Sequence, residues 1–240
     1  AFAGRLLRIL EIADTVITIS AQSETEIRAF AESHGLDRAI RRIILGTPQL
    51  DTESKSAPHQ TEILSPYVLY VASMSERKRH DFLIDAWRAA RDQSAAVRGA
   101  RLILVGRPLG GFERFADAGH QARLAEDGIT VINGCSADHL ARLYRHAVFT
   151  VYPSAAEGWG LPPVESLLMG KPCLISDSLP VAQEIDSAGL KRVPTLSADA
   201  WTDALCHWLD SPDALQAATD QARDFKPPAW AAAADILLTA

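Results

Sequence analysis

Short apolar runs alternate with amphipathic stretches from Tyr67 onward, and this alternation limits the possible folds more than any other feature of the chain. The apolar runs read YVLYVAS, RLILVG, ITVING, FTVYPS and PCLISD, and a segment with helical periodicity follows each of the first four. Strands that are apolar almost throughout are typical of a parallel sheet with helices on both faces. The sequence therefore predicts an α/β domain with a doubly wound parallel sheet.

The first part of the chain differs from this alternating region. We expect four elements there: a helix over 4–12, a strand over 15–19, a helix over 24–33 and a strand over 42–45. These include too few strands for a complete α/β domain. Residues 47–66 are polar and interrupted by prolines, which is typical of an exposed linker. We therefore place a domain boundary in this segment.

Composition and charge exclude several classes of protein. The formal net charge of −6 argues against a protein that depends on contacts with nucleic-acid phosphates. No apolar run approaches the ~18 residues of a membrane-spanning helix, and the first residues lack a secretory pattern. A cytoplasmic protein is expected. The odd number and wide separation of the cysteines predict buried thiols rather than disulfides or a zinc site, at Cys135, Cys173 and Cys206.

One loop of the predicted sheet carries most of the unusual chemistry. Ligands of open parallel sheets bind at the carboxyl ends of the strands, and the loop after FTVYPS reads YPSAAEGWGLPPVESLLMGKP from residue 152 to 172. Gly158 and Gly160 allow the backbone to approach a ligand closely. Pro162 and Pro163 then start a helix. A helix end beside such a loop predicts a site for a phosphate group.

Two carboxylates, Glu157 and Glu165, fall at this predicted anion site with seven residues between them. Because carboxylates repel a diphosphate, we expect them to accept hydrogen bonds from the hydroxyls of an attached ribose and sugar. The alternative is a loop glutamate in solvent and a glutamate that stabilises a helix start. The residues alone leave both interpretations open.

A basic run follows the first strand of this region and reads Arg77, Lys78, Arg79, His80. Its place at a strand's carboxyl end favours neutralisation of a departing diphosphate. A solvated charge run is the alternative. The sequence has neither the glycine spacing of a dinucleotide-binding loop nor a Walker phosphate-binding loop, and no His/Cys cluster has metal-ligand spacing.

The run from Tyr152 to Pro172 closely resembles the glutamate–seven residues–glutamate motif of family four retaining glycosyltransferases, which usually have Phe where Trp159 stands. Further segments resemble that family in the same order: VITISAQSETEI, YVLYVASMSERKRHDFLIDAW, LILVG, ITVINGCSADHLARLYRHA and LPVAQEI. The resemblance implies the GT-B fold, in which two Rossmann-like domains face each other across a cleft. It also implies a nucleotide diphosphate sugar donor and no metal or other cofactor.

The resemblance assigns roles residue by residue. Arg77 and Lys78 would grip the donor diphosphate, Glu165 would bind the ribose hydroxyls, and Glu157 would act at the donor sugar. The remaining donor contacts would come from the loop backbone at Gly158, Trp159, Gly160 and Leu161, and from residues near the base at Gly106, Arg107, Asn133, Cys135 and Leu140. Two residues depart from the family pattern, Ala72 and Arg79, and we expect them to alter the donor pocket.

The resemblance also implies a domain organisation. Residues 1–46 would be the end of an N-terminal, acceptor-side domain, and 47–66 the linker. Residues 67–226 would be the nucleotide-sugar-binding domain. Residues 227–240 would form a C-terminal helix that returns to the N-terminal domain.

These observations predict a retaining, metal-independent hexosyltransferase that uses a GDP- or UDP-sugar and a glycan or lipid-linked acceptor in surface polysaccharide synthesis. Mannose is the first expectation, because ERKR resembles the RK-containing signature of mannosyl and rhamnosyl enzymes. Peripheral contact with a membrane through further N-terminal sequence stays open. The alternative function is a non-catalytic or truncated nucleotide-sugar-binding module. A GT-B epimerase or phosphorylase is a weaker third option.

Overall fold

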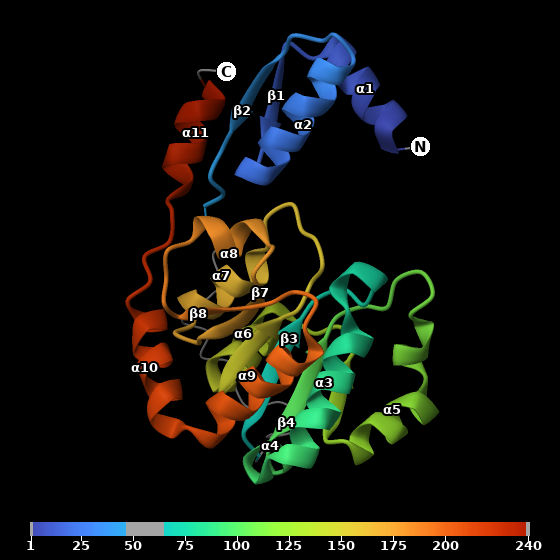
Figure 1. Ribbon diagram of the computed structural model, residues 1–240, viewed down its shortest axis with the longest axis vertical. Helices are drawn as coiled ribbons and strands as arrows, with labels where there is room; N and C mark the ends of the chain where they lie inside the picture. The colour runs from blue at the N-terminus through green and yellow to red at the C-terminus, as the bar shows by residue number, and fades with distance from the viewer. Residues whose placement is uncertain (1, 47–64, 239–240) are drawn as a thin grey trace.

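The computed structural model describes residues 2–46 and 65–238, which form a smaller and a larger α/β unit (Figure 1). The smaller unit contains α1 (Phe2–Ile12), β1 (Thr15–Thr18), α2 (Ala21–Ser33) and β2 (Ala39–Arg42), and its two strands pair in parallel. Its core consists of Leu10, Val16, Ala31 and Ile40. The last strand lies three residues earlier than we expected.

The larger unit is built on a six-stranded parallel sheet in the order β5-β4-β3-β6-β7-β8. The chain enters at the centre of the sheet, adds two strands outward on one side, and then returns to add three on the other. The strands are β3 (Tyr67–Val71), β4 (Arg101–Val105), β5 (Ile129–Ile132), β6 (Phe149–Tyr152), β7 (Cys173–Ser176) and β8 (Leu190–Val193).

Helices connect these strands and cover both faces of the sheet (Figure 1). The α-helices are α3 (His80–Gln93), α4 (Ala95–Gly99), α5 (Ala118–Glu126), α6 (Ala137–His146), α7 (Leu161–Leu168), α8 (Pro180–Glu184), α9 (Ala198–Asp210), α10 (Pro212–Arg223) and α11 (Trp230–Leu238). Two short 3-10 helices complete the unit, η1 (Glu76–Lys78) and η2 (Glu113–Ala116).

The central strand β3 divides the hydrophobic core into two parts. Val68 and Tyr70 belong to the larger core, in which α3 and α9 pack. Tyr67 and Leu69 belong to a smaller core on the other face, with Tyr144 of α6. Successive side chains of a strand point to opposite faces, and the first four residues of β3 are buried, so the strand is covered on both sides. The predicted doubly wound parallel sheet is confirmed.

The two units meet at α8 and α11. Glu184, at the end of α8, accepts a hydrogen bond from the Ala21 amide (2.7 Å) and pairs with Arg42 (2.9 Å). The ring of Trp230 lies against Gly46, where a Cβ atom would come within 2.3 Å of it. Helix α11 therefore lies beside the smaller unit (Figure 1). The predicted linker falls almost entirely on residues 47–64, outside the described residues, and the division into domains stays a prediction.

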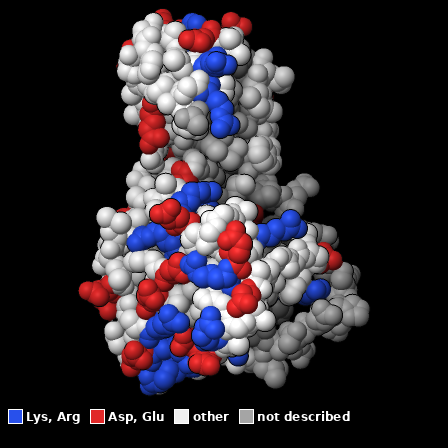
Figure 2. All heavy atoms as spheres, turned by 90° about the vertical axis from the view of Figure 1, so that its right-hand side faces the viewer, with Lys and Arg blue, Asp and Glu red and all other residues white. Residues whose placement is uncertain are grey.

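The surface of the described residues gives two further observations. None of their helices combines the length and the apolar character needed to cross a membrane. On the face shown in Figure 2, basic and acidic side chains are interspersed. This face therefore carries no continuous basic surface of the kind that binds nucleic-acid backbones.

Candidate functional site

The strand order indicates where a ligand is expected to bind, at the carboxyl ends of two central strands. Strands β3 and β6 are neighbours in the sheet, with Val68 paired to Phe149, although β4 and β5 lie between them in sequence. The chain leaves β3 toward one side of the sheet and leaves β6 toward the other. In open α/β sheets, ligands bind at the carboxyl ends of the strands at such a switch point. The segment after β3 contains η1, and the loop after β6 consists of residues 153–160.

A cluster of two cations and one carboxylate connects these two loops. Arg77 Nη1 donates to Glu157 Oε2 at 2.7 Å, and Lys78 Nζ donates to Glu157 Oε1. Lys78 Nζ also donates to the Tyr152 hydroxyl at 2.7 Å. Lys78 is only 6% exposed, whereas the Arg77 side chain is 54% exposed. The structure thus brings Arg77, Lys78 and Glu157 together, as the sequence predicts.

The electrostatics of this cluster depend on burial. Burial lowers the pKa of Lys78, against the opposing effect of its hydrogen bond to Glu157. Burial alone would raise the pKa of Glu157, but hydrogen bonds from Lys78 and Arg77 outweigh it and hold this pKa below its ordinary value. Glu157 is therefore a carboxylate at neutral pH. A diphosphate that bound here would contact Arg77 and Lys78, whose positive charges are already partly neutralised by the carboxylate of Glu157.

Backbone contacts fix the two loops against each other. The Ala155 amide donates to the Arg77 carbonyl at 2.8 Å, and Arg77 Nη1 donates to the Ala156 carbonyl at 3.1 Å. On the other side of η1, the Tyr70 hydroxyl donates to the Lys78 carbonyl at 2.6 Å. The cations therefore stand on a short helix that is held from β3 and from the loop after β6.

The rest of the basic run, Arg79 and His80, lies outside the lining of the cavity described below, and the expected effect of Arg79 on the donor pocket stays a prediction. Arg79 has a left-handed backbone (φ 56°), its guanidinium lies 3.7 Å from the Phe82 ring centroid, and it donates to the Thr195 carbonyl. His80 is fully buried against the Tyr70 ring, and burial lowers its pKa to about 4. A left-handed residue turns the chain sharply, so consecutive side chains diverge.

The second carboxylate of the motif lies in α7. Glu165 Oε2 accepts a hydrogen bond of 2.8 Å from the Tyr144 hydroxyl, which comes from α6. Burial raises the pKa of Glu165, and the hydrogen bond from Tyr144 opposes this effect. Glu165 is therefore a half-buried carboxyl group whose charge is stabilised by one neighbouring donor.

The amino end of α7 offers fewer donors than a helix start usually does. Gly160 is the residue before the helix and has φ 116°, a conformation that favours glycine. Leu161, Pro162 and Pro163 form the first turn. Because proline has no N–H, Leu161 is the one residue of these three with a backbone N–H. The predicted phosphate site at this helix end is therefore narrower than a full turn of free amides.

A cavity of about 620 Å³ joins these groups at the switch point. Its lining contains most of the predicted site residues: Lys78, Gly106, Cys135, Leu140, Glu157, Gly158, Trp159, Gly160, Leu161 and Glu165. Gly106 must be small, because a Cβ atom there would lie 1.8 Å from the Ala72 carbonyl oxygen. The two carboxylates and the buried ammonium thus face one space.

Three predicted residues lie outside this lining. Arg77 reaches the cavity through its ion pair with Glu157. Asn133 donates to the Phe115 carbonyl at 3.1 Å, and Arg107 is exposed. Among the described residues, no hydrogen bond joins the side chain of Asn133 or Arg107 to the lining of the cavity. Their expected place near the base stays a prediction.

Sequence reasoning missed several residues that line the cavity. Ile19 and Leu45 belong to the smaller unit, and Ile19 lies 3.4 Å from the place where a Cβ of Gly158 would stand. Both follow strands of that unit, so the rule that used strand ends in the larger unit could have found them. Tyr152 is the last residue of β6 and could have been found in the same way. The position of Tyr144 carried no such signal.

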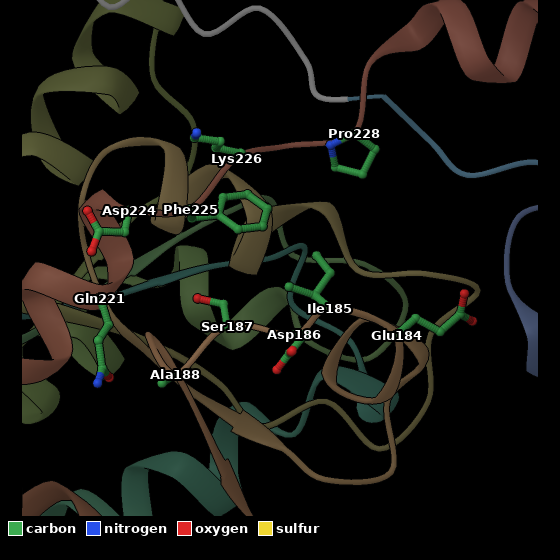
Figure 3. A pocket seen from close by; sticks show the side chains of 10 residues that line it. All are labelled: Glu184, Ile185, Asp186, Ser187, Ala188, Gln221, Asp224, Phe225, Lys226 and Pro228. Atoms are coloured by element: carbon green, nitrogen blue, oxygen red, sulfur yellow. The ribbon is translucent and has the colours of Figure 1, made fainter.

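A second cavity of about 530 Å³ lies where the chain passes from α10 toward α11. Figure 3 shows its lining: Glu184, Ile185, Asp186, Ser187, Ala188, Gln221, Asp224, Phe225, Lys226 and Pro228. Glu184 is already bound to Ala21 and Arg42. We place the candidate site in the first cavity, because the cation–carboxylate cluster and the strand switch point are both there.

The fold and the position of this cavity define the class of protein. A parallel α/β sheet with this arrangement matches the structures of GT-B glycosyltransferases. The sequence family described as "Glycosyl transferases group 1" matches residues 51–225, which is most of the chain. The chain belongs to this family.

Individual relatives agree with this assignment. The chain is 28% identical over 226 residues to the D-inositol 3-phosphate glycosyltransferase of Gordonia bronchialis, covering 88% of this chain and 48% of that protein. It is 33% identical over 90 residues to the O-antigen chain mannosyltransferase RfbU of Salmonella typhimurium, covering 38% of this chain and 25% of that protein. Anabaena Alr3699/HepE, solved with UDP and glucose, has a TM-score of 0.71 at 16% identity, with coverage of 99% and 66%.

Proposed function

We propose that this chain provides the donor site of a retaining hexosyltransferase that uses a nucleotide diphosphate sugar. The observation that carries the proposal is the cluster of Arg77, Lys78 and Glu157, which faces the same cavity as Glu165. Cations and hydroxyl-binding carboxylates around one cavity suit a ligand that contains both a diphosphate and sugars. The chain covers 48% and 25% of the length of the two curated relatives named above, so the reaction is inferred from this site.

In this proposal the positive groups act on the diphosphate. Arg77 is exposed and carries a planar fork of donors, whereas Lys78 is buried and its ammonium lies at the cavity wall. Charge develops on the diphosphate as the bond to the sugar breaks. Fixed cations stabilise such charge most effectively where water is excluded. They would supply the role for which other enzymes use a metal ion, so no metal is needed in the proposed reaction.

The two carboxylates would bind the sugars of the donor. Glu165 lies at the cavity wall with one oxygen held by Tyr144, and its other oxygen would accept hydrogen bonds from ribose hydroxyls. Glu157 and the backbone of residues 158–161 would hold the transferred sugar. Attack from the same face as the departing diphosphate would then retain the configuration of the sugar.

The smaller unit would carry the acceptor side of the site. Ile19 and Leu45 contribute to the cavity wall from this unit, which supports residues 1–46 and 67–226 as parts of two facing domains. We propose residues 47–66 as their linker and 227–240 as the returning helix. Gly106, Arg107, Asn133, Cys135 and Leu140 would lie near the base.

Mannose from GDP-mannose is the first proposal for the donor, since one relative is named as a mannosyltransferase. A UDP-sugar is the second, since Alr3699/HepE was solved with UDP. The proposed acceptor is a glycan or lipid-linked glycan of a surface polysaccharide, glycosylated at the cytoplasmic side of the membrane. Peripheral contact with that membrane is part of this proposal.

Calorimetry with UDP, GDP and dTDP tests the donor site, and a donor-hydrolysis and transfer assay tests the reaction. We expect one nucleoside diphosphate to bind and the matching sugar donor to turn over. Alanine at Arg77 or Glu157 should lower turnover by ~100-fold, the scale for removing one stabiliser of transition-state charge. Turnover at the wild-type level in both variants would refute the assigned roles.

A non-catalytic nucleotide-sugar-binding module is the alternative function. One observation favours it: Glu157 already pairs with both cations, which leaves less positive charge to stabilise a departing diphosphate. Nucleotide binding without hydrolysis or transfer, measured in the same assays, would support the module over the enzyme.

A further inference from the structure

The hydrogen bond between Tyr144 and Glu165 joins two elements that meet at the wall of the first cavity. The hydroxyl comes from α6 and the carboxylate from α7, at 2.8 Å. Tyr144 is 1% exposed, and it is absent from the lining of the cavity. A buried hydroxyl that reaches a carboxylate at a cavity wall acts on that carboxylate, not directly on a ligand.

The surroundings of Tyr144 allow it little freedom. Its ring belongs to the smaller core, with Tyr67 and Leu69 of β3. Helix α6 is capped by Ser136, whose side chain accepts a hydrogen bond from the His139 amide. Leu140, one turn before Tyr144, lines the cavity itself. The hydroxyl is thus fixed relative to the cavity wall by the core of the domain.

Glu165 depends on this hydroxyl for its orientation. A glutamate side chain has several rotatable bonds, and Tyr144 is the donor that the structure gives to its carboxylate. Cys173 of β7 and Tyr152 of β6 are the other ionisable groups that raise the pKa of Tyr144, and Glu165 has no ion pair among the described residues. A half-buried carboxylate without a paired cation needs a hydrogen-bond donor to stay charged and in place.

We propose that Tyr144 is a positioning residue that holds the Glu165 carboxylate in the orientation in which it accepts hydrogen bonds from the ribose hydroxyls of the donor nucleotide. This inference rests on the proposed role of Glu165 and adds a residue that never touches the ligand. It makes α6 the element that sets the ribose specificity of the site.

Tyr67 offers a matched comparison within the same core. Its hydroxyl is also buried and donates to the Leu143 carbonyl at 2.8 Å. This hydrogen bond does not involve Glu165, and Tyr67 is absent from the lining of the cavity. Tyr67→Phe therefore removes a buried hydroxyl from the same core without changing the carboxylate.

The experiment compares ribose-containing and dideoxy nucleotides by calorimetry on the full 240-residue chain. The probes are UDP with 2′,3′-dideoxy-UDP, and GDP with 2′,3′-dideoxy-GDP. The measured quantity is the ratio of the two affinities. Hydrogen bonds to charged groups correspond to roughly 10-fold in affinity or more. We expect the wild-type chain and Tyr67→Phe to prefer the ribose form by about this factor, and Tyr144→Phe and Glu165→Gln to lose most of the preference.

The outcomes separate this inference from the proposed function. An unchanged preference in Tyr144→Phe, with a lost preference in Glu165→Gln, would overturn the positioning role alone. An unchanged preference in both variants, or no binding of either nucleotide by the wild-type chain, would overturn the role of Glu165 as well. Equal weakening of both nucleotides in Tyr144→Phe and Tyr67→Phe would indicate general destabilisation and would also overturn the proposal.

A second variant keeps the test decisive if Tyr144→Phe does not fold. Glu165→Asp retains the charge but withdraws the carboxylate from the Tyr144 hydroxyl. We expect it to lose the preference for ribose. A full preference in Glu165→Asp would overturn the proposal.

Discussion

Replacing Glu157 by Gln should destabilise the free protein and at the same time tighten its binding of a nucleoside diphosphate. The substitution keeps the size and one acceptor oxygen of the side chain but removes the negative charge that pairs with Arg77 and Lys78. Lys78 Nζ donates to two acceptors, Glu157 and the Tyr152 hydroxyl. In the variant, the buried ammonium would have no negatively charged acceptor and would keep the neutral Tyr152 hydroxyl. The diphosphate would replace the charge that the substitution removes.

The burial of the three side chains sets the size of the effect. The side chains of Lys78 and Glu157 are 8% and 9% exposed, and breaking a buried pair of this kind costs about 3 to 5 kcal/mol. The Gln oxygen recovers part of this loss through a neutral hydrogen bond. Arg77 is half-exposed, so its ion pair adds under about 1 kcal/mol. We expect Glu157→Gln to lower the free energy of unfolding by about 2 to 4 kcal/mol.

Urea unfolding with and without UDP or GDP measures both effects. The increase in stability caused by the nucleotide should be larger in Glu157→Gln than in the wild type, because binding no longer competes with the carboxylate. Glu24→Gln is the matched control, since Glu24 forms an exposed pair with Arg28 (3.0 Å) in α2. That variant should change stability by under about 0.5 kcal/mol.

The contribution of Glu157 to stability should also depend on pH. Because the pKa of Glu157 is lowered in the folded protein, its stabilisation is present above the unfolded value of about 4.3 and is lost as the pH falls through the folded value. The difference between the wild type and Glu157→Gln should therefore shrink below about pH 4. Equal unfolding free energies at pH 7, or a smaller nucleotide effect in the variant, would refute this reasoning.

Three further predictions follow from neighbouring residues. Burial lowers the pKa of Lys78, so nucleotide affinity in calorimetric titrations should fall at a lower pH than for an exposed lysine, and Lys78→Arg should abolish this alkaline loss. His80 has a pKa of about 4 in the folded protein against an unfolded value of about 6.5. Up to about 3 kcal/mol of stability should therefore be lost as the pH falls from about 6.5 to about 4. His80→Phe should flatten the pH dependence of the free energy of unfolding measured in urea. Glu184→Gln removes the ion pair to Arg42 between the units. The variant should show a wider distribution of interatomic distances in small-angle X-ray scattering. An unchanged distribution would contradict a role of this pair in holding the units together.

The fold could be predicted from the sequence because the alternation of apolar strands and helices is a local signal. YVLYV and RLILV are apolar at nearly every position, which only a strand covered on both faces requires. The edge strand β8 was missed, because LKRV is half polar and only its first and last residues are buried. The start of α2 was placed three residues late, because the capping side chain is Ser20, which accepts a hydrogen bond from the Ser23 amide.

The candidate site could be predicted where it follows from strand ends and not where it depends on contacts between distant segments. The loops that hold Lys78 and Glu157 follow adjacent strands, so their proximity is a consequence of topology. The divergence of Arg79 from Lys78 depends on one left-handed residue, and nothing in the basic run indicates it. The donor from Tyr144 to Glu165 crosses between helices, and only three-dimensional packing reveals it.

The contact of Glu184 with the smaller unit has a mechanical consequence for the site. Glu184 ends α8, a five-residue helix, and near the start of this helix the Val181 amide donates to the Trp159 carbonyl at 3.3 Å. Val181 also lies so close to Gly160 that a Cβ atom there would approach it within 2.8 Å. Helix α8 thus contacts the smaller unit at one end and the glycine loop at the other. A rotation between the units that kept both contacts would move α8 and the loop together, and would in this way change the shape of the cavity.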